Sequence, residues 1–190
     1  MNNQVIEREI KNFIANTPLN TSEDGTYHYF DEPIIGFANI HDPLFREIAN
    51  HIDPEQYPTA SDWLARELRH EPIVGTVIAW SLPISKHVLD TNRTEKKIPS
   101  IEWAHVRYYG EQLNNALRQH MRDFFHHQNI PNISPQIDEH WSRITASNTG
   151  ISSNWSERHA AYVAGLGTFS LNDALITVNG IAHRVGSILS

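Results

Sequence analysis

The stretch Ile73-Val74-Gly75-Thr76-Val77-Ile78-Ala79-Trp80 is the part of this sequence that says most about the fold. β-Branched and aromatic residues dominate it, and none of its residues carries a charge. A run of this kind is typical of a strand that is covered on both faces. We therefore expect a central strand over residues 73–80, with other elements packed on each side of its sheet.

Helical patterns lie on both sides of this strand. Upstream, apolar residues recur with helical spacing from Val5 to Ile14, and further helices are expected from Pro43 to about His51 and over 61–69. Downstream, Ser100 is suited to cap the longest helix, which should run to about His127. The polar, proline-containing stretches 83–99 and 128–141 are expected to connect these elements.

The last part of the chain suggests a hairpin. Asn179-Gly180 separates the apolar runs 174–178 and 181–189, a pattern typical of a type I′ turn between paired strands. A short strand is also expected over Ile34–Ala38. Helices and strands in irregular order predict an α+β fold: an α/β sandwich with a mixed sheet flanked by helices and ending in a β-hairpin. Residues 1–190 fit one domain with a core of its own.

Composition restricts the function classes. The 190 residues carry a formal net charge of -7, which argues against a protein that coats nucleic acid. No cysteine is present, so disulfides, thiolate zinc sites, thiol nucleophiles and cysteine-ligated iron–sulfur clusters are excluded from this chain. The sequence has no apolar run long enough to span a membrane and no signal-peptide pattern at its start. We therefore expect a cytoplasmic protein with no membrane partner.

Glycines and charges cluster around the last predicted helix. Asn154 followed by Glu157 has the spacing of a capping box that opens this helix, and Gly165 or Gly167 should end it. These glycines either cap the helix or let the backbone approach a ligand. They do not form a dinucleotide-binding loop, because they follow a helix and the third glycine is replaced by Ser170. Arg158 stands where a helix dipole disfavours a cation, so we expect it to have an anionic partner.

Two groups on the longest predicted helix have chemical potential. Arg107-Tyr108-Tyr109 joins a cation to phenols that can donate a proton near a reacting centre; the alternative is ordinary amphipathic packing. His120, Asp123 and His127 share one helix face and could hold a metal, although a solvated face is the commoner arrangement, and we assign no metal site.

The block from Asn154 to Thr177, NWSERHAAYVAGLGTFSLNDALIT, resembles a conserved segment of epoxyqueuosine reductases. It is still more similar to the SERH…AGLGTFG form in reductive dehalogenases and their iron–sulfur relatives. Weaker similarity extends to Val74–Pro83, to Arg107-Tyr108-Tyr109-Gly110 and to the continuation from Gly180 to Leu189. The strong match covers about the last fifth of the chain.

The resemblance implies a nitroreductase-like sandwich that binds cobalamin, followed in the family by a ferredoxin-like domain with two [4Fe–4S] clusters. That cluster domain would be absent from this chain and supplied by a missing domain or a partner. The substrate would be a small molecule or a nucleoside-type compound. By the same resemblance the cofactor would be lined by Glu157, Arg158, His159, Gly165, Leu166, Gly167, Thr168 and Phe169, and the catalytic residues would be Tyr108 or Tyr109 with Arg107.

The chain also departs from the epoxyqueuosine reductase pattern. Ser170-Leu171 replaces a Gly-Lys pair, and residues 149–154 lack the acidic residue that the family carries before its Glu-Arg pair. In addition, Gly110 is followed by Glu111-Gln112-Leu113-Asn114, where the family has the pattern x-Asp-Tyr-His. The catalytic acid of queuosine synthesis therefore has no match, and the substrate is left open. Two other interpretations remain: a non-catalytic interaction or dimerisation domain on the same scaffold, and a flavin-binding enzyme of nitroreductase type.

Overall fold

The computed structural model describes residues 2–190, and its mixture of helices and strands confirms the predicted α+β fold. The sheet is not mixed as expected, because the strand pairs within these residues are all antiparallel. Strand β2 (Thr76–Pro83) lies between β1 (Ile34–Asn39) and β7 (His183–Leu189), and pairs antiparallel with both. Every residue of β2 after the first is buried. The prediction of a central strand covered on both faces is therefore confirmed.

The expected start of this strand was wrong. Ile73 and Val74 are 89% and 79% exposed and precede the sheet. Gly75 directly precedes the strand. A side chain would not fit at this position, because a Cβ would lie 2.7 Å from the side chain of Ile40 and 2.8 Å from that of Leu64. The predicted strand included Ile73 and Val74 because they are apolar, but the structure leaves both side chains exposed.

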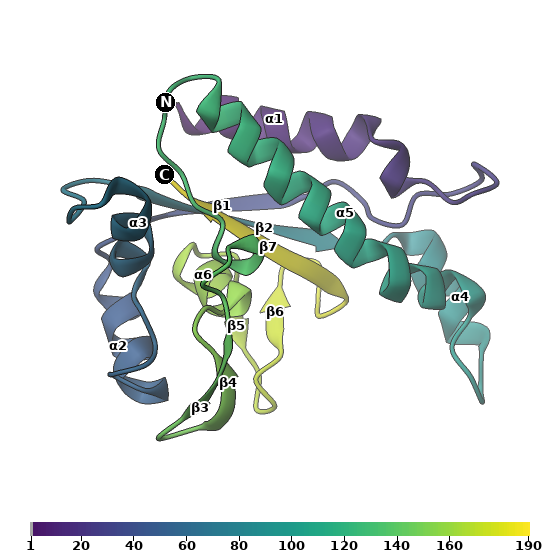
Figure 1. The fold of residues 1–190 in the computed structure, drawn as a ribbon. Helices are drawn as coiled ribbons and strands as arrows, with labels where there is room; N and C mark the ends of the chain where they lie inside the picture. Colours follow the sequence, from purple (N-terminus) through teal and green to yellow (C-terminus); the bar gives the residue numbers. More distant parts are fainter. Residues whose placement is uncertain (1) are drawn as a thin grey trace.

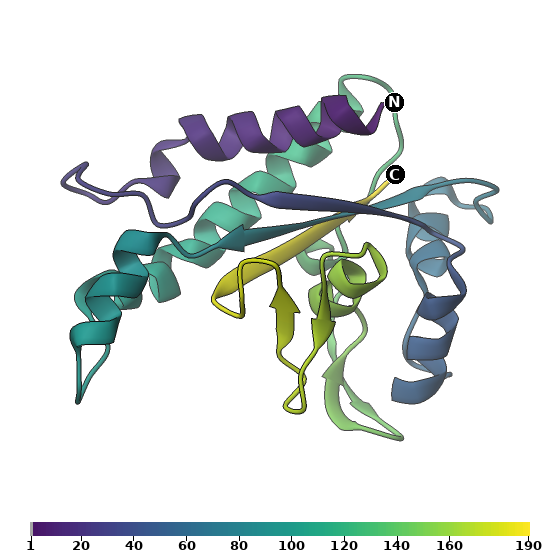
Figure 2. The ribbon, with the colours of Figure 1, turned by 180° about the vertical axis from the view of Figure 1, so that it is seen from behind.

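Two long helices cover one face of the sheet, α1 (Asn3–Asn16) and α5 (Ile101–His126), as Figures 1 and 2 show from opposite sides. Alternate residues of β2, among them Ile78 and Trp80, pack into the core beneath these helices. Trp80 faces Gly186 across the β2–β7 pair, and a Cβ on Gly186 would lie 2.5 Å from the indole. A glycine is therefore required beside this large ring.

The other face of the sheet is covered by shorter elements: α2 (Pro43–Ile52), α3 (Ala60–Leu68) and α6 (Glu157–Val163). Val77 packs there with Trp63 and Trp155. The β5–β6 ribbon, made of Gly167–Phe169 and Leu175–Thr177, lies beside α6 on this side. The molecule thus has layers of secondary structure on both faces of a small sheet.

Several elements were not expected from the sequence. The stretch 83–99 contains a helix, α4 (Lys86–Thr94), which Ser85 caps and in which only Val88 is buried. Strands β3 (Arg143–Ala146) and β4 (Gly150–Ser153) form an antiparallel ribbon. Single 3-10 turns occupy Pro18–Asn20 and Pro135–Ile137. α4 is almost wholly polar, so it carries little hydrophobic periodicity to reveal it.

The predicted C-terminal hairpin was wrong. Asn179-Gly180 does lie in a tight turn, with reciprocal hydrogen bonds of 3.1 and 2.9 Å between Thr177 and Gly180. The chain then separates, because β6 pairs with β5 whereas β7 pairs with β2. The last apolar run gains more from burial against β2 in the three-stranded sheet than it would from a two-stranded ribbon.

The predicted cap of α6 was also wrong. Ser156 is the N-cap, and its hydroxyl accepts a hydrogen bond from the backbone N–H of His159 at 3.4 Å. The side chain of Asn154 instead joins the preceding loop to β4, accepting from the Ser142 N–H at 3.0 Å and donating to the His140 carbonyl at 2.8 Å. Glu157 therefore does not take part in the cap, and its side chain is buried in the protein.

Candidate functional site

Helix α6 buries Glu157 against a cation of another helix. Oε1 of Glu157 lies 3.2 Å from Nη2 of Arg118 on α5, and the two side chains are 9% and 2% exposed. Burial raises the pKa of the Glu157 carboxyl, and the charge of Arg118 acts in the opposite direction. The sequence indicated Glu157 as a surface capping or cofactor-lining residue, but the structure places it in a buried ion pair.

The ion pair continues into a network on the surface. Nη1 of Arg118 lies 2.8 Å from Glu111, and the other oxygen of Glu111 lies 2.6 Å from Nη1 of Arg184. Gly110 makes room for this arrangement, since a Cβ there would lie 2.6 Å from Nε of Arg184. The network links α5, α6 and β7 around the outer edge of the sheet.

Sequence reasoning missed Arg118, Glu111 and Arg184. The sequence did contain a sign that Arg118 is buried, because this charged residue stands on the apolar face of its helix, beside Leu117 and Met121. A buried arginine is rare unless it is paired. Glu111, seven residues earlier on the same helix, was the accessible partner.

The two residues after Glu157 on α6 differ in exposure, since Arg158 is exposed and His159 is half-buried. Arg158 is exposed and donates a hydrogen bond to the backbone carbonyl of Asp173, so its partner is a carbonyl and not the anion expected. The ring of His159 lies 5.2 Å from that of Phe169 and 6.4 Å from that of Tyr57. Burial lowers the pKa of His159 to about 4, so this imidazole is neutral at pH 7. The structure thus brings His159 beside Phe169, whereas Glu157 and Arg158 contact other parts of the protein.

Gly165 follows α6 as a helix cap. Its φ is +76°, its N–H bonds to the Tyr162 carbonyl at 3.0 Å, and the Leu166 N–H bonds to the Ala161 carbonyl at 2.9 Å. This is the Schellman arrangement, for which glycine is favoured because it adopts positive φ without strain. The sequence left open whether this glycine caps the helix or lets the backbone approach a ligand, and the structure shows that it caps the helix.

Gly167 has another reason to be glycine. A Cβ at this position would lie 2.2 Å from the backbone carbonyl oxygen of Ile176 on the neighbouring strand. Its missing side chain thus makes room for the protein's own backbone. Leu166 is buried against the sheet, whereas Thr168 is exposed and is paired in register with Ile176.

Arg107, Tyr108 and Tyr109 lie on the first half of α5, in different surroundings. The hydroxyl of Tyr109 donates to Glu23 at 2.9 Å, and its ring stacks on Tyr29. Tyr108 is 68% exposed. The backbone carbonyl of Arg107 accepts a hydrogen bond from Arg184 at 3.2 Å, which joins this segment to the start of β7.

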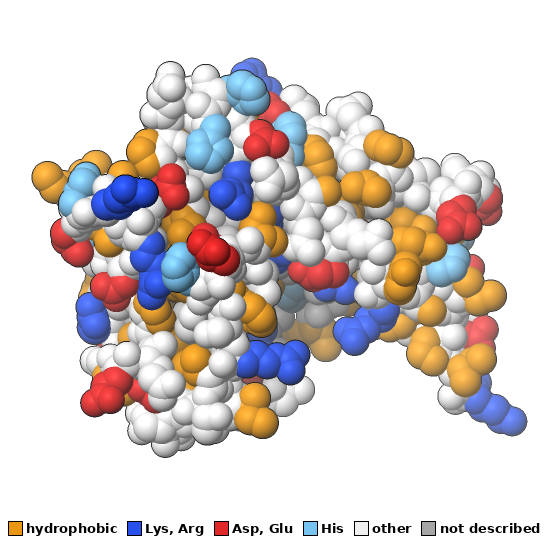
Figure 3. Space-filling model, in the orientation of Figure 1, with side chains coloured by type: hydrophobic (Ala, Val, Ile, Leu, Met, Phe, Trp, Pro, Cys, Tyr) orange, Lys and Arg blue, Asp and Glu red, His pale blue; other side chains and the backbone are white. Residues whose placement is uncertain are grey.

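A notch separates the first half of α5 from the segment that leads into β7. The space-filling view is hollowed between the lobe that carries β3–β6 and the arm that carries α4, with cationic and hydrophobic side chains around the hollow (Figure 3). Its floor is a pocket of about 170 Å³, lined by Ile84, Trp103, Val106, Arg107, Ile181, Ala182, His183 and Arg184. Burial lowers the pKa of both His183 and Arg184.

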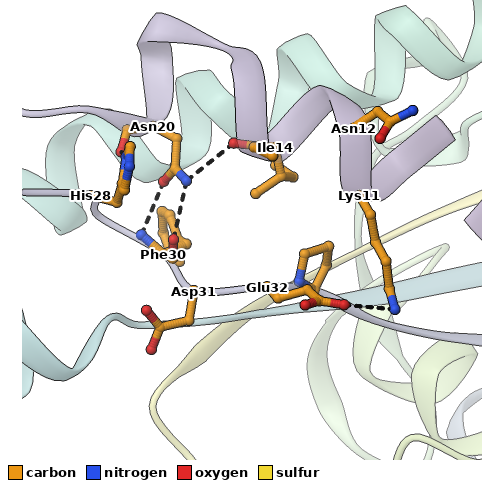
Figure 4. A pocket seen from close by; sticks show the side chains of 10 residues that line it. Lys11, Asn12, Ile14, Asn20, His28, Phe30, Asp31 and Glu32 are labelled. Carbon is orange, nitrogen blue, oxygen red and sulfur yellow. Dashed lines mark hydrogen bonds and ion pairs between the residues drawn. The ribbon is translucent and has the colours of Figure 1, made fainter. Parts of the chain in front are cut away.

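A larger hollow, of about 460 Å³, lies between α1 and residues 28–33 (Figure 4). Its polar groups already have partners. Asn20 donates to the carbonyls of Ile14 and Phe30 and accepts from the Phe30 N–H, and Lys11 pairs with Glu32 at 2.7 Å. The hollow therefore offers little unused hydrogen-bonding capacity to a ligand.

The metal face considered on α5 does not assemble in the structure. His120 lies 2.7 Å from Glu9 of α1, and Nδ1 of His127 contacts the backbone carbonyl of Asp123. Residues 2–190 contain no group of three or more side chains arranged to hold a metal ion. Nor does any helix within these residues combine the length and apolar character needed to span a membrane.

Comparisons with known proteins add no relative: no family model, no curated protein and no solved structure matches this chain.

Proposed function

We propose that this chain binds a corrinoid in the notch between the first half of α5 and the segment leading into β7, as the cofactor-binding part of a reductase. The observation that carries the proposal is a set of exposed apolar side chains next to a cationic floor. Ile181, 66% exposed, lines the pocket together with Trp103, and Arg107 and Arg184 lie among the same lining residues.

This arrangement matches the chemistry of a corrinoid. The macrocycle is a large, flat and mostly apolar body whose rim carries amide groups. Exposed apolar side chains gain from contact with its face. Guanidinium groups donate hydrogen bonds to rim carbonyls, and Arg107 lines the pocket where it can do so, whereas Arg184 is held by Glu111 and the Arg107 carbonyl. The notch is open, so a second domain or chain is needed to cover the other face of the cofactor.

The resemblance implies that the segment Ala164-Gly165-Leu166-Gly167 (AGLG) lines the cofactor directly. Its contribution to the present proposal is different. Gly165 and Gly167 serve the cap and the β5–β6 contact, so they do not form a bare backbone cradle. Thr168 and Ile176 share the exposed face of the β5–β6 ribbon, and Ile176 is 41% exposed. Val178, 88% exposed, continues this apolar surface towards Ile181. The segment therefore reaches the proposed site through residues 178–181, of which Ile181 lines the pocket.

A corrinoid in a reductase must receive electrons, and this chain has no cysteine with which to hold an iron–sulfur cluster. The proposed reductase would therefore depend on a ferredoxin-like domain or partner, as the family resemblance implies. Its substrate would reach the cofactor from the open side of the notch.

The test is binding of hydroxocobalamin, followed by its visible spectrum during gel filtration. Wild-type protein should co-elute with the cofactor at tens of micromolar. Ile181→Glu should weaken binding at least tenfold, because it places a charge on the apolar wall. Ile151→Glu is the matched control, since Ile151 is 89% exposed on β4 and lines no part of the notch. Absence of co-elution, or equal binding by Ile181→Glu, would overturn the proposal.

The same exposed apolar surface supports the second candidate, a non-catalytic dimerisation domain. Here two copies would cover each other's notch, and sedimentation would show a concentration-dependent dimer that Ile181→Glu dissociates. If FMN rather than cobalamin raises the melting temperature, the chain is a flavin-binding protein instead.

A further inference from the structure

A second pocket, of about 320 Å³, lies between the β3–β4 ribbon and the first turn of α6. It is lined by Trp141, Arg143, Ile151, Ser152, Ser153, Ser156, Arg158 and His159, and shares no residue with the notch. No aspartate or glutamate lines it, although acidic residues outnumber basic ones in the chain by 22 to 15. The pocket is therefore a local concentration of positive charge on an acidic protein.

The two guanidinium groups of this pocket are free to bind a ligand. Among residues 2–190, neither Arg143 nor Arg158 forms an ion pair with a carboxylate. Both side chains belong to exposed residues. Arg158 is steadied by its hydrogen bond to the Asp173 carbonyl, which restricts the guanidinium without neutralising it.

Unsatisfied buried groups provide a second, independent observation. The indole N–H of Trp141 and Nδ1 of His159 are buried and have no hydrogen-bond partner among residues 2–190. Buried polar groups in native proteins are nearly always paired, so two orphan nitrogens among the residues of one pocket indicate a missing partner. The indole N–H of Trp141 can only donate, so an acceptor oxygen satisfies it, and the two arginines beside it favour an oxygen that belongs to an anion.

We propose that this pocket binds the phosphate-ester group of a small molecule. A phosphate has enough oxygens to accept from both guanidiniums and from the serine hydroxyls, and arginine is well suited to it because its planar fork pairs with two oxygens at once. The pocket is larger than a phosphate group alone. Trp141 and the exposed Ile151 supply an apolar surface for the organic part of the ligand.

The test uses adenosine monophosphate and inorganic phosphate as probes, with uncharged adenosine for comparison. Titration calorimetry should detect adenosine monophosphate binding with a sub-millimolar Kd and no binding of adenosine. In ¹⁵N NMR spectra the indole N–H signal of Trp141, assigned through Trp141→Phe, should shift when either phosphate probe is added.

Arg143→Gln is the decisive variant, because Arg143 is exposed and its loss should leave the fold unchanged. It should weaken adenosine monophosphate binding at least tenfold. Arg8→Gln removes the same charge from an exposed position on α1, across the sheet, and should bind as the wild type does. Equal affinities of these two variants would show a general charge effect and overturn the proposal, as would binding of adenosine as tight as that of its monophosphate. Failure of cobalamin binding leaves this result unaffected, since the two sites share no residue.

Discussion

Arg118 of α5 and Glu157 of α6 meet beyond the outer edge of the sheet, with Nη2 and Oε1 3.2 Å apart and both side chains buried. The helices lie on opposite faces of β7, so this ion pair joins the two layers of the molecule. Arg118 has a second carboxylate partner, Glu111, at 2.8 Å. Glu157 is paired with the cation of Arg118. The pair is therefore asymmetric.

This asymmetry predicts unequal costs of mutation. Arg118→Ala should lower the free energy of unfolding by about 3–5 kcal/mol, because it leaves Glu157 buried without a cation. Glu157→Gln should cost about 1–2 kcal/mol, because Arg118 keeps Glu111. Urea unfolding at pH 7 measures both. A cost below about 1 kcal/mol for Arg118→Ala would falsify the assignment of a buried charge pair.

The two glycines after α6 should respond differently to alanine. Gly165→Ala places a side chain in open space but at φ +76°, so it should cost only about 1 kcal/mol. Gly167→Ala brings a Cβ within 2.2 Å of the Ile176 carbonyl and must separate β5 from β6, at a cost of about 2–3 kcal/mol. Melting temperatures of the two variants give the comparison. Equal shifts would contradict the close contact.

The half-buried imidazole of His159 predicts loss of stability in mild acid. Its pKa is about 4 in the folded protein against about 6.5 when unfolded, so between these values the unfolded chain binds more protons. The stability that His159 contributes is complete above pH 6.5 and falls as the pH drops towards 4, by at most about 3 kcal/mol.

Replacement of His159 by Phe should remove this part of the pH dependence. Urea unfolding at pH 7 and pH 5 should show a smaller difference for His159→Phe than for the wild type. His70→Gln, on the exposed segment after α3, is the control and should keep the wild-type difference. If both variants match the wild type, the low pKa of His159 is wrong.

The absence of cysteine gives a prediction about redox chemistry. Reconstitution of this chain with iron and sulfide should yield no stoichiometric [4Fe–4S] signal in electron paramagnetic resonance after dithionite reduction, because thiolate ligands are missing. A cysteine-containing ferredoxin treated in parallel serves as the positive control. A cluster held by this chain would show that the proposed dependence on a separate electron-donating domain is mistaken.

Much of the architecture followed from local patterns. The stripe from Val5 to Ile14 predicted α1, and Ser100 capped α5 as expected. Polar elements gave no such pattern: α4 buries only Val88, and the β3–β4 ribbon buries only Ala146. Their formation depends on the elements around them.

For the candidate site, the sequence by itself determined which residue types were available: no thiol, two glycines (Gly165 and Gly167) that could end a helix, and cations at Arg107, Arg143 and Arg158. The tertiary structure alone decided what each of them contacts. Glu157 pairs with Arg118, and Arg143 comes beside Arg158, only because β7 and the β3–β4 ribbon bring distant segments together. Helix and strand patterns arise from neighbours a few residues apart, whereas burial, charge pairing and pockets depend on long-range packing that no local pattern encodes.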